Sequence, residues 1–141
     1  MTQPRSNLEV QFETFSYRHA EEILNAHFAV KKEIVELLNN VQQSSATRGA
    51  NSLHSRIIKD FVARGWETET PVAANQPNEQ RFDLFKHPVA IEIEFSRYEF
   101  LYRDYMRFLY AYNADAIEVS VLVIQSSAPK GKSYAPSLER V

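Results

Sequence analysis

Apolar and polar residues alternate along the chain in ways that predict both helices and strands. Residues 8–12 alternate with a period of two, which predicts a half-buried strand. Over residues 19–41 apolar positions recur at helical spacing, which predicts two helices or one bent helix. A polar break over 42–49 separates them from a further predicted helix over 51–64, which Gly65 ends.

The second half of the chain has the pattern of a hairpin followed by strand, helix and strand. Residues 66–72 predict a strand, and a polar loop follows over 73–80. Two further strands, over 81–85 and 89–95, are joined by the short segment Lys-His-Pro. These segments predict a β-hairpin in the middle of the sequence.

A helix and a last strand are predicted after the hairpin. Ser96 and Glu99 have the spacing of a capping box, and the helix that follows runs to about Asn113. Its inward face is expected to carry the large side chains of Tyr98, Leu101, Tyr102, Tyr105, Leu109 and Tyr112. Residues 118–124 are nearly all apolar and rich in β-branched side chains, which predicts a buried central strand.

This order of elements predicts the α/β class, with a mixed central β-sheet flanked by helices. The 141 residues fit one domain, of which 125–141 form an irregular tail up to a helix start near Pro136 and Ser137. We find no internal repeat.

Composition removes several classes of site. The chain has no cysteine, which excludes disulfides, thiolate zinc sites and cysteine nucleophiles, and its three glycines cannot form a glycine-rich phosphate loop. The N-terminus is polar and no run of about 18 apolar residues occurs, so we expect a cytoplasmic protein without a membrane segment. With a net charge of −2, any DNA binding must rest on local basic patches.

The predicted hairpin carries three acidic residues. Side chains two apart on a strand share a face, so Glu92 and Glu94 project together, away from Val89, Ile91 and Ile93. An even hairpin register places Asp83 opposite Glu92, and burial of the apolar face favours that register.

Three carboxylates then converge on one face. Repulsion between them would become coordination if a hard cation such as Mg²⁺ bound there, and such a site suits phosphodiester hydrolysis. The alternative is that Glu92 and Glu94 form the solvated face of an amphipathic strand. The residues by themselves leave both interpretations open.

The segment RFDLFKHPVAIEIEFSRYEFLYRDYMRFLYAYNADAIEVSVLVIQS resembles the active-site segment of the PD-(D/E)XK nucleases. The similarity is to type II restriction endonucleases of the BglII and BamHI kind, and the opening SYRHAEEIL is similar to the start of BglII-type proteins. Together the two segments cover about two-thirds of the chain. Enzymes of this kind are usually longer, so we expect the fold to lack their usual C-terminal elements.

By that resemblance, Asp83 and Glu92 would ligate Mg²⁺. Glu94 stands where the wider superfamily has Lys, the BamHI-like proteins Glu and the BglII-like proteins Gln, and it would position or deprotonate the attacking water. An earlier polar residue often completes the site. Glu69 or Glu67 could serve, and we choose Glu69 as the third metal ligand although alternation does not decide between them.

The resemblance also implies a homodimer that cuts both strands of a palindromic duplex. Candidate DNA contacts are four basic residues on two predicted helices: Arg56, Lys59, Arg97 and Arg103. More often, such residues form a solvated helix face or pair with nearby acids. The leading hypothesis is a Mg²⁺-dependent endonuclease for double-stranded DNA. Its alternatives are an inactive DNA-binding or protein-interaction module with the same fold and a hydrolase of small phosphorylated substrates.

Overall fold

The computed structural model describes residues 14–41, 52–71, 81–95 and 99–124, to which all structural statements below refer. The helices in these ranges are α1 (Ala20–Ala26), α2 (Phe28–Asn39), α3 (Leu53–Ala63) and α4 (Phe100–Asn113). The strands are β1 (Glu67–Pro71), β2 (Arg81–Lys86), β3 (Val89–Ile93) and β4 (Val119–Val123). The segment 19–41 is therefore two helices. The helical conformation is interrupted between them at His27, whose φ of −106° and ψ of 58° are not helical.

One mixed sheet contains the four strands in the order β1-β2-β3-β4. Neighbours are antiparallel from β1 to β3, whereas β3 and β4 are parallel and α4 makes the connection between them. The predicted α/β class and the mixed sheet are thus confirmed. No helix in the described ranges has the length and apolar character needed to cross a membrane.

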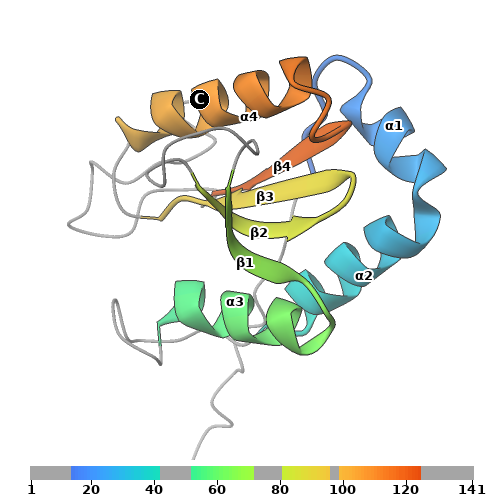
Figure 1. The fold of residues 1–141 in the computed structure, drawn as a ribbon. Helices are drawn as coiled ribbons and strands as arrows, with labels where there is room; N and C mark the ends of the chain where they lie inside the picture. Colours follow the sequence, from blue (N-terminus) through green and yellow to red (C-terminus); the bar gives the residue numbers. More distant parts are fainter. Residues whose placement is uncertain (1–13, 42–51, 72–80, 96–98, 125–141) are drawn as a thin grey trace, which may run out of the picture.

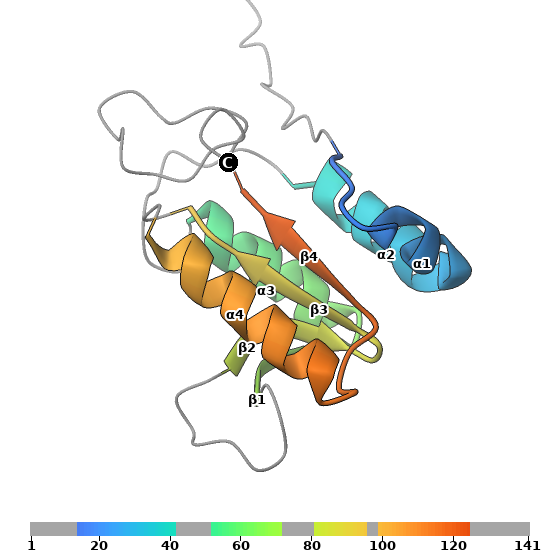
Figure 2. The same ribbon diagram turned by 90° about the horizontal axis from the view of Figure 1, so that it is seen from above.

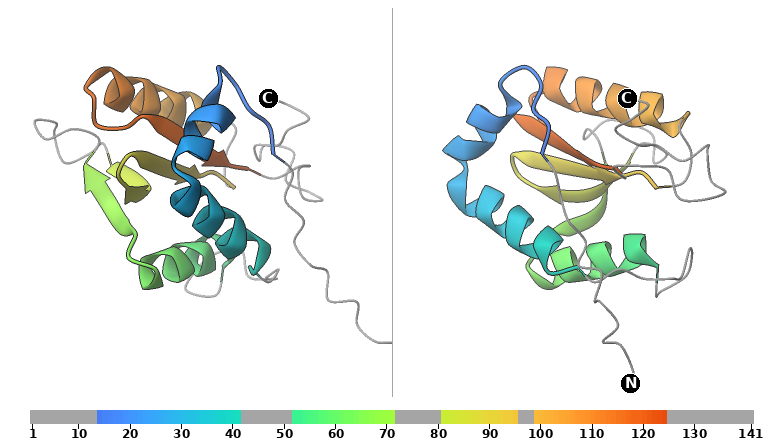
Figure 3. Two further views of the ribbon diagram at one scale, coloured as in Figure 1. Left: turned by 90° about the vertical axis from the view of Figure 1, so that its right-hand side faces the viewer. Right: turned by 180° about the vertical axis from the view of Figure 1, so that it is seen from behind.

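Helices cover both faces of the sheet (Figure 1). The larger core lies between the sheet and helices α2 and α3, where Ile57 and Phe61 of α3 are completely buried. The smaller core lies under α4, where Phe108 and Ala111 pack on Phe82. Helices α1 and α2 follow one another along the β4 side of the sheet (Figures 2 and 3). Each fully buried large apolar side chain contributes about 1.5–3 kcal/mol, so these cores fix the orientation of the strands between them.

The hairpin of β2 and β3 has the predicted even register. Leu84 pairs with Ile91 and Lys86 with Val89, which leaves a two-residue turn of His87 and Pro88. All five residues of β3 are buried, because helices cover both of its faces. Glu92 and Glu94 are therefore buried, which excludes the alternative that they form the solvated face of an amphipathic strand.

The regular alternation of β2 breaks at Asp83. Phe82 and Leu84 are two residues apart and would share one face of a regular strand. Instead, Phe82 belongs to the core under α4, and Leu84 belongs to the core over α2 and α3. Phe82 stacks with Phe85, with 6.5 Å between ring centroids, on the α4 side. Asp83 lies at this break and is half-buried.

The predicted inward face of α4 is wrong. Tyr102, Tyr105, Leu109 and Tyr112 are exposed, and the buried residues of the helix are Asp104, Phe108 and Ala111. The sheet opposite the first half of α4 carries Glu92 and Glu94, so a face with charged partners fits there better than a tyrosine face. Phe108 and Ala111 then fill the apolar space further along the helix.

Two further expectations need correction. Strand β4 is an edge strand of the described sheet, not a central one, and its Leu122 is 36% exposed. Helix α4 begins at Phe100, and its N-cap Glu99 makes no side-chain capping bond. The Ser96 half of the predicted capping box, the strand over 8–12 and the tail over 125–141 lie outside the described residues.

Candidate active site

The Asp83 carboxylate lies between β2 and β3, where their ladder ends. The last pair of the ladder is Leu84 with Ile91, and the next pair in the same register is Asp83 with Glu92. There, Asp83 Oδ2 accepts a hydrogen bond from the backbone N–H of Ile93 over 2.9 Å. The side chain thus takes the place of a backbone acceptor and is held by the central strand.

His54 approaches Asp83 from the first turn of α3. Ser52 caps this helix by accepting the N–H of Ser55 over 3.2 Å, and His54 Nε2 lies 3.8 Å from Asp83 Oδ2. Burial raises the pKa of Asp83, but His54, the Glu92 carboxyl and the Ile93 N–H together lower it below its ordinary value. Asp83 is therefore an anion at neutral pH. Hydrogen bonding to Asp83 in turn raises the pKa of His54 against the opposing effect of burial, and the charge of Asp83 acts in the same direction.

Glu92 is 2% exposed and belongs to the central strand. Burial and then the neighbouring charge of Asp83 raise the pKa of Glu92 to about 9. A hydrogen bond between the two carboxyl groups acts in the same direction on Glu92. At neutral pH the pair therefore carries one proton, held on Glu92. Oε1 of Glu92 is buried without a hydrogen-bond partner among the described residues.

Three charged residues of α4 face this pair and Glu94. Arg107 Nη1 lies 3.6 Å from Glu92 Oε1 and 3.7 Å from Asp104 Oδ1. Arg103 Nη2 lies 3.7 Å from Glu94 Oε2 and 3.6 Å from the same Asp104 oxygen. The five side chains form a chain of alternating charge, which we call the charge chain: Glu94, Arg103, Asp104, Arg107 and Glu92.

Asp104 is the most deeply placed member of the charge chain. It is 1% exposed, and neither of its carboxylate oxygens has a hydrogen-bond partner among the described residues. Burial and then the charge of Glu94 raise the pKa of Asp104 to about 6, although Arg103 and Arg107 act in the opposite direction. A buried carboxylate with unsatisfied oxygens costs free energy, so its presence here points to a functional role.

The two candidate glutamates of β1 lie at different points of the sheet. Glu67 pairs with Phe85, and its Oε2 accepts a hydrogen bond from the Thr70 hydroxyl over 3.3 Å. In the same register Glu69 lies opposite Asp83, with a left-handed φ of 57°. A glutamate in this conformation is strained, by an amount on the order of 1 kcal/mol. Glu69 is exposed and remains a predicted ligand, at the position in β1 that faces Asp83.

The candidate DNA-binding residues fall into three groups. Arg103 belongs to the charge chain, is 44% exposed at its side chain and stacks its guanidinium 4.4 Å from the Phe100 ring centroid. Arg56 and Lys59 lie on α3, where Lys59 is exposed and Arg56 half-buried. Arg97 lies outside the described residues. The contacts of these four residues with DNA stay predictions.

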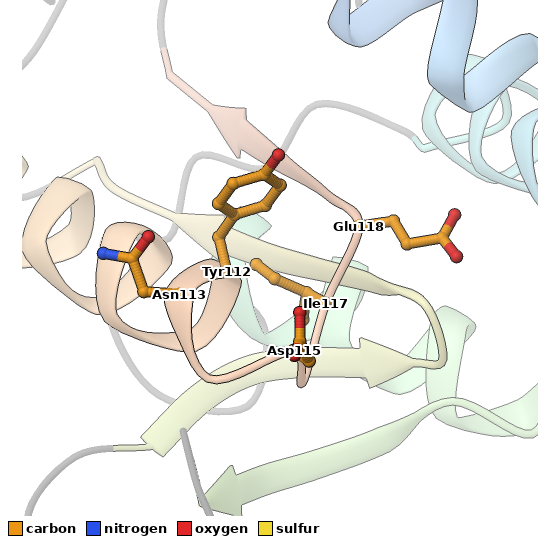
Figure 4. A pocket seen from close by; sticks show the side chains of 5 residues that line it. All are labelled: Tyr112, Asn113, Asp115, Ile117 and Glu118. Atoms are coloured by element: carbon orange, nitrogen blue, oxygen red, sulfur yellow. The ribbon is translucent and has the colours of Figure 1, made fainter.

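A concavity of 410 Å³ lies at the other end of α4, lined by Tyr112, Asn113, Asp115, Ile117 and Glu118 (Figure 4). Glu118 points away from this hollow toward the first helices, where its Oε2 lies 2.7 Å from His27 Nε2. Through this contact His27, at the junction of α1 and α2, binds Glu118, the residue before β4. The concavity does not include any of the acidic residues of the charge chain.

Comparison with known proteins assigns this arrangement to a family. The family model described as "Restriction endonuclease BglII/BglIII" matches residues 12–138, which is most of the chain and includes every acidic residue named above. The chain belongs to this family. The predicted resemblance is thereby confirmed.

One solved structure shows the same fold as this family member. It is the "Crystal structure of restriction endonuclease BGLII complexed with DNA 16-mer", with a TM-score of 0.65 and 19% sequence identity. The match covers 88% of our chain and 63% of that chain, so our chain spans less than two-thirds of the BglII chain. No curated protein sequence matches the chain.

The acidic residues of this BglII/BglIII family member fit a divalent cation. In the described ranges no three His, Asp or Glu side chains are grouped so as to hold a metal ion as they stand. The structure thus brings two of the three predicted carboxylates together, Asp83 and Glu92, with Glu94 beside Arg103. Mg²⁺ often takes only one or two carboxylates and completes its shell with water and phosphate. The unpartnered Oε1 of Glu92 offers such a cation a ready ligand.

Three residues of the site are not among the predicted ones: Asp104, Arg107 and His54. Asp104 and Arg107 are three residues apart on one face of α4, and Asp104, Phe108 and Ala111 recur there at i, i+4 and i+7, so this second periodic face is the sequence signal for both. His54 has no such signal. No local signal connects it with Asp83, which is distant in the sequence and adjacent only in the fold.

Proposed function

We propose that the protein is a Mg²⁺-dependent endonuclease that hydrolyses phosphodiester bonds of double-stranded DNA, as a type II restriction enzyme does. The observation that carries this proposal is the Asp83–Glu92 carboxyl pair between β2 and β3, in which Glu92 is buried and keeps an oxygen without a hydrogen-bond partner among the described residues. Membership of the restriction endonuclease family supports it. We expect the enzyme to act in the cytoplasm.

Asp83 and Glu92 would hold the cation. When bound, it would supply Lewis-acid stabilisation of the phosphate and a water of lowered pKa. The Asp83 carboxylate is already ionised and fixed by the Ile93 N–H, so it needs no rearrangement to act as a ligand. Glu92 must release its proton, which the cation's charge favours.

The other residues of the site bind and orient. Glu94, on the same side of β3, would position or deprotonate the attacking water. Arg103, partly exposed beside Glu94, is the described arginine best placed to contact a phosphate. Arg56 and Lys59 on α3, with Arg97, would contact the DNA backbone or bases. Glu69 would complete the site from β1.

A homodimer would place one such site on each DNA strand. The outer face of α4 supports this part of the proposal. Tyr102, Tyr105, Met106 and Leu109 follow one another at helical spacing on that face, and Met106 is 60% exposed. A stripe of large side chains of this kind is typical of an interface. That the BglII structure contains DNA supports the duplex as the partner.

The test is cleavage of plasmid DNA with Mg²⁺ by the wild-type chain and by Glu92→Gln. Wild type should convert supercoiled plasmid to discrete fragments, and the variant should lose about 100-fold or more in rate because a ligand is gone. Glu36→Gln, an exposed charge change on α2, should leave the rate unchanged. Cleavage that survives in Glu92→Gln would show that the site lies elsewhere.

A second candidate is a DNA-binding or protein-interaction module that keeps the fold without activity. The absence of a three-ligand group among the described residues favours it. It predicts duplex binding without cleavage, and a melting temperature that Mg²⁺ does not change.

A further inference from the structure

The two arginines of the charge chain each lie between two carboxylates. The distances from Arg107 to Glu92 and Asp104 are 3.6 and 3.7 Å, and those from Arg103 to Glu94 and Asp104 are 3.7 and 3.6 Å. Each guanidinium is therefore almost equidistant from a strand glutamate and from Asp104. These separations exceed a normal hydrogen bond, so each of the four contacts is an ion pair without hydrogen-bond geometry.

Asp104 has unused capacity to accept hydrogen bonds. Its Oδ1 and Oδ2 are both buried and without a partner among the described residues, and Oδ1 is the atom that faces both arginines. A carboxylate can accept a guanidinium through two parallel hydrogen bonds, which is the strongest neutralising contact open to it. Movement of either guanidinium toward Asp104 by about 0.8 Å would bring it to the length of such bonds.

A divalent cation on Glu92 would compete with Arg107 for the same carboxylate. Charges of equal sign about 4 Å apart repel one another strongly at the effective dielectric of a protein surface. The guanidinium must therefore move away when a cation binds. Arg107 is 13% exposed at its side chain, so it cannot simply turn into solvent, and it already faces the Asp104 carboxylate at 3.7 Å.

We propose that Asp104 is a positioning residue that receives Arg107 when a cation binds Glu92. Arg107 lies between Glu92 and Asp104 in the cation-free protein and stays at the site, paired with Asp104, once the cation is bound. This inference rests on the cation site of the proposed function. It adds a separate step, the movement of the Arg107 guanidinium from Glu92 toward Asp104.

The test is a double-mutant cycle on the binding of Ca²⁺ alone, by calorimetry, to the full chain without DNA. Arg107→Gln removes the competing charge and should raise the affinity about tenfold. Asp104→Asn removes the receiving carboxylate and should lower the affinity about tenfold. The two changes together should resemble Arg107→Gln, since the guanidinium that Asp104 would receive is already gone.

Additive effects, which would return the double variant to wild-type affinity, would mean that the two charges act independently and would overturn the proposal. A lower affinity in Arg107→Gln would overturn it too. Arg64→Gln, an exposed change of the same charge after α3, should leave the affinity unchanged. Should Arg107→Gln fail to fold, Arg107→Lys keeps the competing charge and should stay within about twofold of wild type, and a tenfold rise there would overturn the proposal.

The outcome can be separated from that of the nuclease assay. Coupled Ca²⁺ binding without DNA cleavage would refute the proposed function and leave the role of Asp104 intact. Cleavage with an additive cycle would do the reverse. A wild-type chain that binds no Ca²⁺ would overturn the role of Asp104.

Discussion

Replacing Glu92 by Gln should make the cation-free protein more stable at alkaline pH. The folded-state pKa of Glu92 is about 9, against an ordinary value of 4.5 in the unfolded chain. The folded state therefore binds the proton more tightly. Its contribution to stability is fully present below pH 4.5 and is lost progressively as the pH rises to about 9. Gln has the same shape, can donate to Asp83 and does not titrate.

The magnitude follows from linkage. One proton bound by the folded state and not by the unfolded state changes the free energy of unfolding by about 1.4 kcal/mol per pH unit. Between pH 6.5 and 8 the wild type should therefore lose about 2 kcal/mol more than Glu92→Gln. Asp104, with a pKa of about 6, has mostly titrated below this window, and His54 contributes equally to both proteins.

Urea unfolding in EDTA at several pH values between 6.5 and 8 measures the difference. Glu36→Gln serves as the control, because Glu36 is exposed on α2 and should follow the wild-type curve. Mg²⁺ at pH 8 should restore stability to wild type and have little effect on Glu92→Gln, which lacks the ligand. Parallel curves for wild type and Glu92→Gln would refute the conclusion that Glu92 is protonated in the folded state.

Two further predictions concern α4. Phe108→Ala should destabilise the protein by about 3 kcal/mol in urea unfolding, because Phe108 stacks on Phe82 at 5.9 Å in the smaller core; a loss under 1 kcal/mol would mean that α4 is held by other contacts. Met106→Glu should convert a dimer to a monomer in sedimentation velocity, with little change in monomer stability because Met106 is 60% exposed; an unchanged sedimentation coefficient would place the dimer interface elsewhere.

The sequence was sufficient to predict the hairpin and its register. Burial of Ile91 on the same side as Leu84 allows only the even register, and that register brings Asp83 to Glu92.

The sequence was insufficient to predict the buried face of α4, because two helical faces have the periodicity of a buried face. Tyr102 and Tyr105 make one helical stripe, and Asp104 and Phe108 make another. Pattern reasoning prefers the aromatic stripe, since it takes charged residues to be solvated. Buried charges of α4 oppose buried charges of β3, a pairing that appears only when the two elements are brought together.

The departures from ordinary folding rules converge on one place, and this convergence supports the site independently of the family match. Glu69 has a left-handed φ, β2 loses its alternation at Asp83, and Glu92 is buried in the central strand. Asp104 opposes them with two unsatisfied oxygens. Each of these features costs stability, and apolar residues at positions 92 and 104 would pack with less cost. A sequence keeps such features together where function needs them, because a fold selected for stability alone would have no reason to place all four side by side.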